Sequence, residues 1–161
     1  MSTQLSVWIF QAINAVGLSL WLLIAALNNC KGFAGSVGAV GATLSMAPLK
    51  EAPAIDTPLL GRALAAPWWP RLALGVVLAL QVFAALACLV GTYQLLVGGD
   101  LAAARPWLNL ALSGFAGFIF AMHLGGLWFG YWIRQEGLQL SHLALLIWVS
   151  LAFFLFNLSL A

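Results

Sequence analysis

Four long apolar stretches limit what this chain can fold into. They cover residues 5–27, 72–97, 107–133 and 138–160. Each exceeds the roughly 20 residues that an α-helix needs to cross about 30 Å of hydrocarbon. Only 6% of the 161 residues are charged, against about 25% in a soluble domain. We therefore predict an all-α, four-helix transmembrane bundle that forms a single integral membrane domain over residues 1–161.

The remaining composition excludes several classes of protein. The net charge is +2 with no basic run, which excludes a nucleic-acid footprint and leaves the lipid bilayer as the expected surroundings. Cys30 and Cys88 are far apart in the sequence, so we expect two unpaired thiols and no metal site. Residues 1–10 lack the basic start of a signal peptide, and we expect the first span to be retained.

The first connection, residues 28–71, is predicted to be a long loop that carries a short interfacial helix. Apolar residues recur at three- and four-residue spacing in residues 33–46, which are too few to span a membrane. This segment lies flat at the interface or folds back onto the bundle. Five prolines follow, so residues 47–70 should be irregular, with at most one short helix around residues 59–66. The connection between the second and third spans is short, and Arg105–Pro106 is expected to begin the third helix.

The third span carries a line of small residues, one every fourth position. These are Ser113, Gly117, Ala121 and Gly125. Such a seam lets another helix backbone approach closely, and it predicts a packing or partner surface. His123 lies on roughly the opposite side, where Gly126 and Gly130 leave space beside it. Because the link before this span is short, spans two and three should be antiparallel neighbours.

Polar and aromatic side chains mark further positions. We expect Asn14 in the first span to form an interhelical hydrogen bond, with a contact to a ligand or partner in a cavity as the alternative. His142, Ser150 and Asn157 share one face of the fourth span, where they bond to neighbouring helices or line a solute path. Tryptophans flank the spans and, with one arginine, predict interfacial anchors: Trp68, Trp69, Trp128, Trp132 and Arg134. Tyr131 is expected to belong to the same aromatic belt at the end of the third span.

No catalytic or cofactor motif is present. The four carboxylates all fall outside the expected spans, so a buried ion site or proton relay has no acidic candidate. A haem would need two histidines at one depth. If the third helix continues to residue 133, His123 lies about 15 Å deep, and His142 about 6 Å. This mismatch argues against a shared iron, so we expect no cofactor, no metal and no enzymatic activity.

A resemblance to a known family adds to these predictions. It rests on Asn28–Asn29 after the first span, the LSM tripeptide at residues 44–46, and the sequence GGLWFGYWIRQEGLQLSH at residues 125–142. Over nearly its whole length, the chain resembles the bacterial predicted small integral membrane proteins known as domain of unknown function 2165 (DUF2165). The resemblance implies a four-helix bundle in the bacterial cytoplasmic (inner) membrane, with cytoplasmic termini and an external first loop. It implies no activity.

The chain departs from this family pattern at two points. The connection between spans two and three, often longer and basic in relatives, holds only Arg105 as a cation. Leu127 stands where relatives often carry an acidic residue, so no charged-site chemistry is carried over. The other basic side chains lie on the side of the first loop, which by the positive-inside rule would be cytoplasmic. Orientation therefore stays open between the two arguments.

Two functional hypotheses follow. The first is a non-catalytic accessory or stabilising subunit that docks on other membrane helices through the small-residue seam. The alternative is a homo-oligomeric small-solute channel or carrier that uses His123 and the polar face of the fourth span. A membrane enzyme is the weakest of the hypotheses.

Overall fold

The computed structural model describes residues 2–157, and every regular element in that part of the chain is a helix. Four of the helices are long and apolar enough to cross a membrane. They are α1 (Thr3–Lys31), α4 (Trp68–Leu96), α5 (Leu101–Trp128) and α6 (Glu136–Asn157). The all-α class is therefore confirmed, and the four predicted spans correspond to these helices. Residues 158–160 of the fourth predicted span lie outside the described residues.

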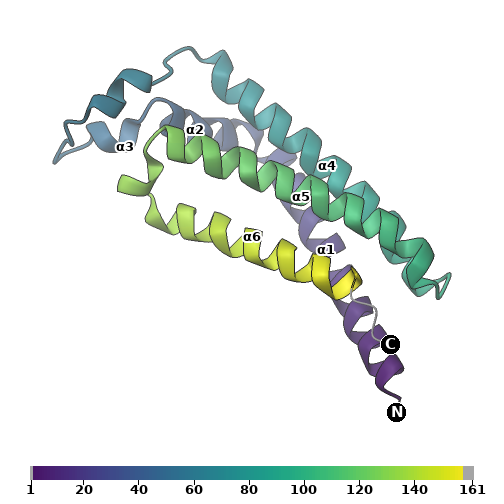
Figure 1. The fold of residues 1–161 in the computed structure, drawn as a ribbon. Coiled ribbons are helices and arrows are strands. Elements are labelled where there is room, and N and C mark those ends of the chain that lie inside the picture. Colours follow the sequence, from purple (N-terminus) through teal and green to yellow (C-terminus); the bar gives the residue numbers. More distant parts are fainter. Residues whose placement is uncertain (1, 158–161) are drawn as a thin grey trace.

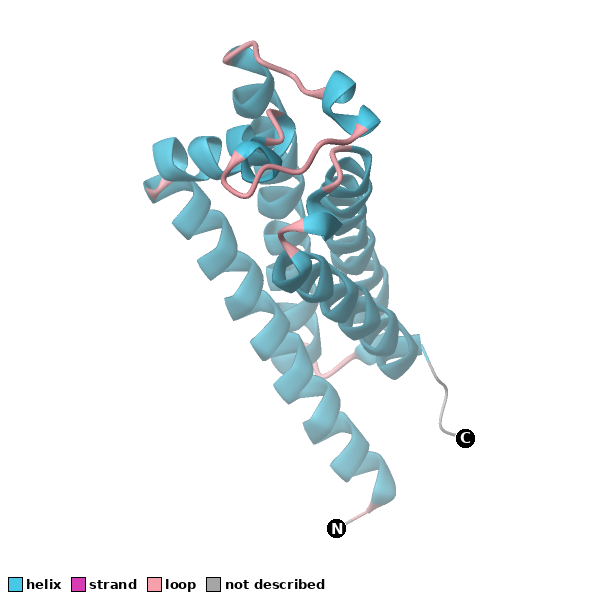
Figure 2. Cartoon of the chain, turned by 90° about the vertical axis from the view of Figure 1, so that its left-hand side faces the viewer, coloured by secondary structure: helices cyan, strands magenta, loops and turns pink. Residues whose placement is uncertain are grey.

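The long helices form a bundle in which α5 lies between α4 and α6 (Figure 1). Helices α4 and α5 pack along their lengths as antiparallel neighbours, as the short connection predicts. Helix α1 packs mainly against α4. The beginning of α1 and the end of α6 lie at the same end of the bundle, and the first connection lies at the other (Figures 1 and 2).

The third span begins earlier than predicted because Asp100 caps it. The Asp100 carboxylate accepts hydrogen bonds from the backbone N–H groups of Ala102 and Ala103, at 2.8 and 3.2 Å. An aspartate in this position satisfies donors that the first helical turn leaves free. Helix α5 therefore begins at Leu101, and Pro106 lies inside the helix. The prediction that Arg105–Pro106 begins this helix is wrong.

The third span also ends earlier than predicted. Helix α5 stops at Trp128, and Gly130 then adopts a left-handed conformation with φ 66°. Glycine enters this region without a steric penalty, which makes it a frequent helix terminator. A single turn of 3₁₀-helix, η2 (Tyr131–Ile133), follows and leads into α6. The chain thus reverses about five residues before the predicted end of the span.

The prediction of a long first loop with one interfacial helix is not borne out. Helix α1 continues to Lys31, and only Gly32 separates it from α2 (Phe33–Leu44). Met46, in the left-handed conformation, leads into α3 (Ala47–Lys50). The 3₁₀ helix η1 (Pro58–Arg62) comes before α4, which itself begins at Trp68. Most of the connection is therefore helical, and its longest helix folds back onto α4, where Gly41 lies against Pro70.

A small core of its own holds this connection in place. Met46, Leu49 and Phe129 are buried together, so the connection packs against the turn that follows α5. The Arg134 side chain donates a hydrogen bond to the Pro53 carbonyl. The backbone N–H of Leu64 donates to the carbonyl of Leu44. Burial of apolar side chains here explains why residues predicted as irregular have a defined path.

The main core is aromatic at its centre and closely packed between α4 and α5. The Trp21 ring of α1 stacks on Phe115 of α5 at 4.8 Å and meets Trp148 of α6 edge-on at 5.6 Å. Glycines bring α4 and α5 together: a Cβ at Gly91 would lie 2.8 Å from Leu108 Cγ. Small residues at such interfaces let helix backbones approach closely in membranes.

Polar side chains link the helices across this core. The Gln11 amide donates to the Leu155 carbonyl of α6. Asn109 and Asn157 form a reciprocal amide pair between α5 and α6, with N···O distances of 2.9 and 2.7 Å. Arg105 donates to the carbonyl of Phe156 near the end of α6. These bonds satisfy polar groups that lipid cannot solvate.

Both cysteines are unpaired, as predicted. Cys30 is exposed at the end of α1, and Cys88 is buried in α4. The Ser19 hydroxyl lies 3.2 Å from the Cys88 sulfur and 2.9 Å from the Thr92 hydroxyl. The buried thiol therefore belongs to a small polar contact between α1 and α4.

Candidate functional site

A cavity of about 620 Å³ opens between α2, α4, α5, η2 and the start of α6. Most of its wall is apolar, and none of the described residues that line it carries a charge. Its amide, hydroxyl and imidazole groups belong to Asn29, Ser36, Thr43, Tyr131, Gln135 and His142. A concave, mainly apolar cavity with a few polar groups is typical of a small-molecule site.

Three buried rings from three elements meet beside this cavity, and two of them, Tyr131 and His142, line it. They belong to His123 of α5, Tyr131 of η2 and His142 of α6. The Tyr131 hydroxyl oxygen lies 2.7 Å from Nδ1 of His123 and 3.3 Å from Nδ1 of His142. The centroids of the two imidazoles are 6.2 Å apart. The phenol therefore bridges the two histidines, and we call these residues the His–Tyr–His cluster.

Two glycines make the cluster possible. Gly130 takes the left-handed conformation that turns the chain back after α5. Gly126 leaves room for the returning ring: a Cβ there would lie 2.7 Å from two ring carbons of Tyr131. The space predicted beside His123 is thus filled by Tyr131, which the sequence suggested only as a member of the aromatic belt.

Few protons are available for the two hydrogen bonds that Tyr131 makes with the histidines. Burial raises the pKa of Tyr131, so its hydroxyl keeps its proton at neutral pH. A phenol donates only one hydrogen bond, and a neutral imidazole carries one N–H. If one histidine accepts the phenol proton at Nδ1, the other donates its own Nδ1–H to the phenol oxygen. The tautomers of His123 and His142 are therefore coupled through Tyr131.

The predicted depth mismatch between His123 and His142 is wrong. It assumed that the third helix continued to residue 133, whereas α5 ends at Trp128 and the chain turns back there. His123 is consequently only five residues from the end of its helix, and its ring centroid lies 6.2 Å from that of His142 in the second turn of α6. Both facing Nδ1 atoms are occupied by the Tyr131 hydroxyl.

A second group of polar side chains joins α1, α2 and α4 at the cavity. The Asn29 amide donates to Gln81 Oε1 at 2.8 Å, and the Ser36 hydroxyl donates to Asn29 Oδ1 at 3.0 Å. The Thr43 hydroxyl donates to Gln135 Oε1 at 3.3 Å. Sequence reasoning did not assign these residues to a site. The sequence feature that could have pointed to these residues is Asn29 at the end of the first span. The structure shows that this helix continues almost directly into α2.

Comparison with known proteins settles the family. The family described as "predicted small integral membrane protein (DUF2165)" matches residues 7–159. This chain belongs to the DUF2165 family. Comparison with curated proteins and with solved structures gives no significant match. The earlier resemblance is therefore confirmed, and the segment of residues 125–142 on which it partly rested contains Gly126, Gly130, Tyr131 and His142.

No helix within residues 2–157 of this DUF2165 protein covers the small-residue seam. Ser113, Gly117 and Ala121 are exposed. A Cβ added at Gly117 or Gly125 would meet nothing within 4 Å. Close packing inside the bundle uses Gly91 and Gly114 instead. The seam therefore runs along the outer face of α5, and Ala121 and Gly125 also line the cavity.

The other polar residues predicted for the DUF2165 chain have separate surroundings. The Asn14 amide donates to the Phe10 carbonyl of its own helix at 2.8 Å, and Gln11 makes the interhelical bond instead. Ser150 donates to Leu146 in its own helix. His142 and Asn157 contact other elements, as one prediction had it. The structure brings only His123 and His142 of this set together.

The predicted anchors lie at the end of the bundle that holds the first connection. Trp68 and Trp69 stack at 3.9 Å in the first turn of α4, and Trp69 lines the cavity. Arg62 lies over the exposed Trp128 ring, 4.5 Å from its centroid. Trp132 is exposed, and Arg134 is bonded to the first connection.

Within residues 2–157, no three His, Cys, Asp or Glu side chains are grouped to hold a metal ion.

Proposed function

We propose that this DUF2165 protein is a non-catalytic accessory or stabilising subunit that docks on a helix of another membrane protein. The outer face of α5 carries the proposal. Its small residues stay uncovered, while larger exposed side chains border them: Leu110, Phe120 and Leu124. Small residues flanked by larger ones form a shallow groove into which a second helix can pack closely.

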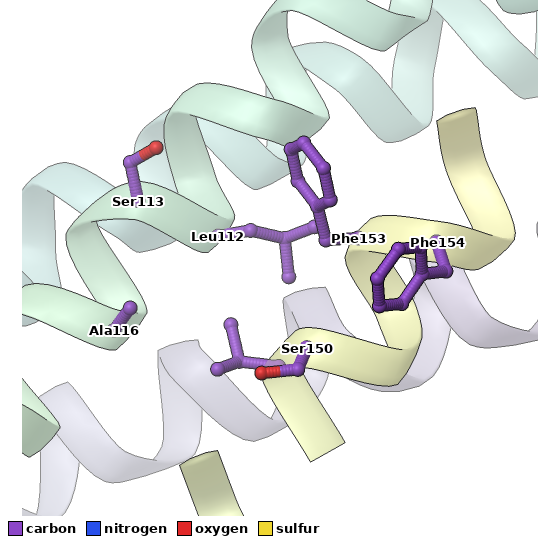
Figure 3. Close-up of a pocket in the computed structure, with 7 residues that line it drawn as sticks. Leu112, Ser113, Ala116, Ser150, Phe153 and Phe154 are labelled. Carbon is purple, nitrogen blue, oxygen red and sulfur yellow. The ribbon is translucent and has the colours of Figure 1, made fainter. Parts of the chain in front are cut away.

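A neighbouring groove of about 270 Å³ between α5 and α6 widens this surface (Figure 3). Ser113 and Ala116 line it from α5, and Ser150, Phe153 and Phe154 line it from α6. Both serine hydroxyls donate to carbonyls of their own helices, at 2.8 to 2.9 Å. The groove therefore presents mainly methylene and ring surface, which suits an apolar partner helix.

Photo-crosslinking from the seam tests the docking proposal. A photoreactive residue at Gly117 should give an adduct with a different protein in native membranes, whereas one at Leu86 should not. Leu86 is 59% exposed on α4 and serves as the matched control. The Gly117→Leu substitution fills the groove, and it should lower recovery of the partner about tenfold in native mass spectrometry. A monomer under all conditions, or adducts only between copies of this chain, would contradict the proposal.

We further propose that the protein lies in a bacterial cytoplasmic membrane with both termini in the cytoplasm. The shared end of the bundle at which α1 begins and α6 ends supports placing both termini on one side of the membrane. The choice of the cytoplasmic side rests on the family resemblance. Exposed Cys30 then lies on the outer side, and buried Cys88 is an internal control. A membrane-impermeant maleimide should label Cys30 in intact spheroplasts and leave Cys88 unreacted until unfolding. Labelling of Cys30 only after permeabilisation would reverse the orientation.

The alternative of a homo-oligomeric small-solute channel or carrier has less support. A polar path would need side chains that are free to exchange partners along the fourth span. Asn157 is paired with Asn109, and the Ser150 hydroxyl is bonded within its own helix. His123 is buried against Tyr131. These contacts favour structural roles for the polar face of α6.

A further inference from the structure

The position of the cavity indicates how a ligand would be oriented. Trp69 in the first turn of α4 and Gln135 just before α6 lie at the end of the bundle away from the termini. Val76, Val77 and Met122 line the part that lies deeper along the helices. A ligand would therefore place a polar group near the helix ends and an apolar body among these side chains.

The charge of the lining restricts the ligand further. No Lys, Arg, Asp or Glu among residues 2–157 lines the cavity. An ionised group placed there would lose its hydration without gaining a counter-ion, which is costly in an apolar environment. The ligand should therefore be neutral.

The geometry of the His–Tyr–His cluster indicates which hydrogen-bonding group is available. The 2.7 Å contact with His123 suits a phenol O–H that donates to Nδ1, and the 3.3 Å contact suits a weaker bond in which His142 Nδ1–H donates to the phenol oxygen. His142 then carries its proton on Nδ1, and its Nε2 is an acceptor.

The acceptor atom Nε2 of His142 is not fully buried. The structure gives His142 Nε2 no hydrogen bond within residues 2–157, and no fully buried side-chain nitrogen or oxygen there lacks one. The Nε2 atom must therefore reach accessible space, and His142 lines the cavity. The two side-chain amide oxygens of the lining each already accept a hydrogen bond: Gln135 Oε1 from Thr43 and Asn29 Oδ1 from Ser36.

We propose that this cavity binds a neutral, lipid-soluble alcohol or phenol, whose hydroxyl donates to Nε2 of His142 while its apolar body lies against Val76, Val77 and Met122. A volume of about 620 Å³ is in the range of small-ligand pockets, roughly 300–1,000 Å³. The site shares Ala121 and Gly125 with the seam on the outer face of α5, but the proposed hydrogen bond at His142 involves no seam residue. Tyr131 acts as a positioning residue, because it holds His142 in the tautomer that accepts.

The test compares ligands that differ only at the head group. With the protein in lipid nanodiscs, calorimetry should show saturable binding of 4-octylphenol. The methyl ether 4-octylanisole has the same apolar body but no O–H donor. It should bind about tenfold more weakly, a ratio of affinities that corresponds to the free energy of one hydrogen bond. The anion 4-octylbenzoate should show no saturable binding. Equal affinities for the phenol and its ether, or equal binding of the anion, would overturn the proposal.

Variants then locate the site. His142→Phe should remove the preference for the phenol while leaving the affinity for the ether similar, a comparison that does not depend on absolute stability. Val76→Trp fills the cavity and should abolish saturable binding of both compounds. Leu86→Trp, on the exposed surface of the same helix, should change neither affinity. If the preference for the phenol survives in His142→Phe, another group is the acceptor and the proposal fails.

Discussion

Replacing Gly91 with alanine is expected to loosen the contact between α4 and α5. The added Cβ would lie 2.8 Å from Cγ, 2.9 Å from Cδ2 and 3.0 Å from the backbone nitrogen of Leu108, which is fully buried. A side-chain rotation alone cannot relieve a contact with backbone, so the helices must separate. We expect the free energy of unfolding to fall by about 1–3 kcal/mol, as for other overpacked cores.

Gly75→Ala in the same helix is the matched control. A Cβ at Gly75 would meet nothing within 4 Å. This substitution should leave stability unchanged or raise it by up to about 1 kcal/mol, since alanine is the better helix former. Unfolding in mixed micelles, followed by circular dichroism, compares the two variants. Equal changes in both would show that helix propensity, not the contact with Leu108, decides the outcome at Gly91.

Hydropathy was sufficient to predict the number and approximate position of the membrane helices, because an apolar stretch of that length has few alternatives in a bilayer. It could not predict where they end. Helix α5 begins at the Asp100 cap and stops before the left-handed Gly130. Both ends depend on local hydrogen bonding and backbone conformation, to which hydropathy is insensitive.

The structure of the first connection was beyond prediction for a different reason. Its short helices bury few residues by themselves, and α2 has none. They become ordered through contacts with distant parts of the chain, such as Leu49 against Phe129 and Arg134 with Pro53. Periodicity within the segment therefore indicated a helix in residues 33–46 but not its place against α4.

The candidate site was only partly visible in the sequence. His123 and His142 were recognised as unusual, but their separation depended on the wrong helix end. Tyr131 was grouped with the exposed tryptophans because an aromatic side chain near a span end is typical of an interfacial belt. The clue that distinguishes it is the pair Gly126 and Gly130, one helical turn apart, which provides both the space for its ring and the reversal.

Replacing Gly126 with alanine should therefore disrupt the His–Tyr–His cluster. A Cβ would lie 2.7–2.8 Å from three ring carbons of Tyr131, including Cγ. Since Cγ is attached directly to Cβ, no small rotation removes the clash, and the whole ring must shift. Its hydroxyl would then leave Nδ1 of His123 and His142. We expect a loss of about 1–3 kcal/mol in stability from overpacking, together with altered tautomers at both imidazoles.

The adjacent glycine supplies the control for this change. Gly125 is on the same helical turn, and a Cβ there would meet nothing within 4 Å. Gly125→Ala should keep the cluster, so the ¹⁵N chemical shifts of both imidazoles should match those of the unmodified protein in detergent micelles. Gly126→Ala should move the Nδ1 shifts of both histidines at once, because one phenol couples their protons. A change at only one histidine, or identical spectra for the two variants, would mean that Tyr131 does not bridge the pair.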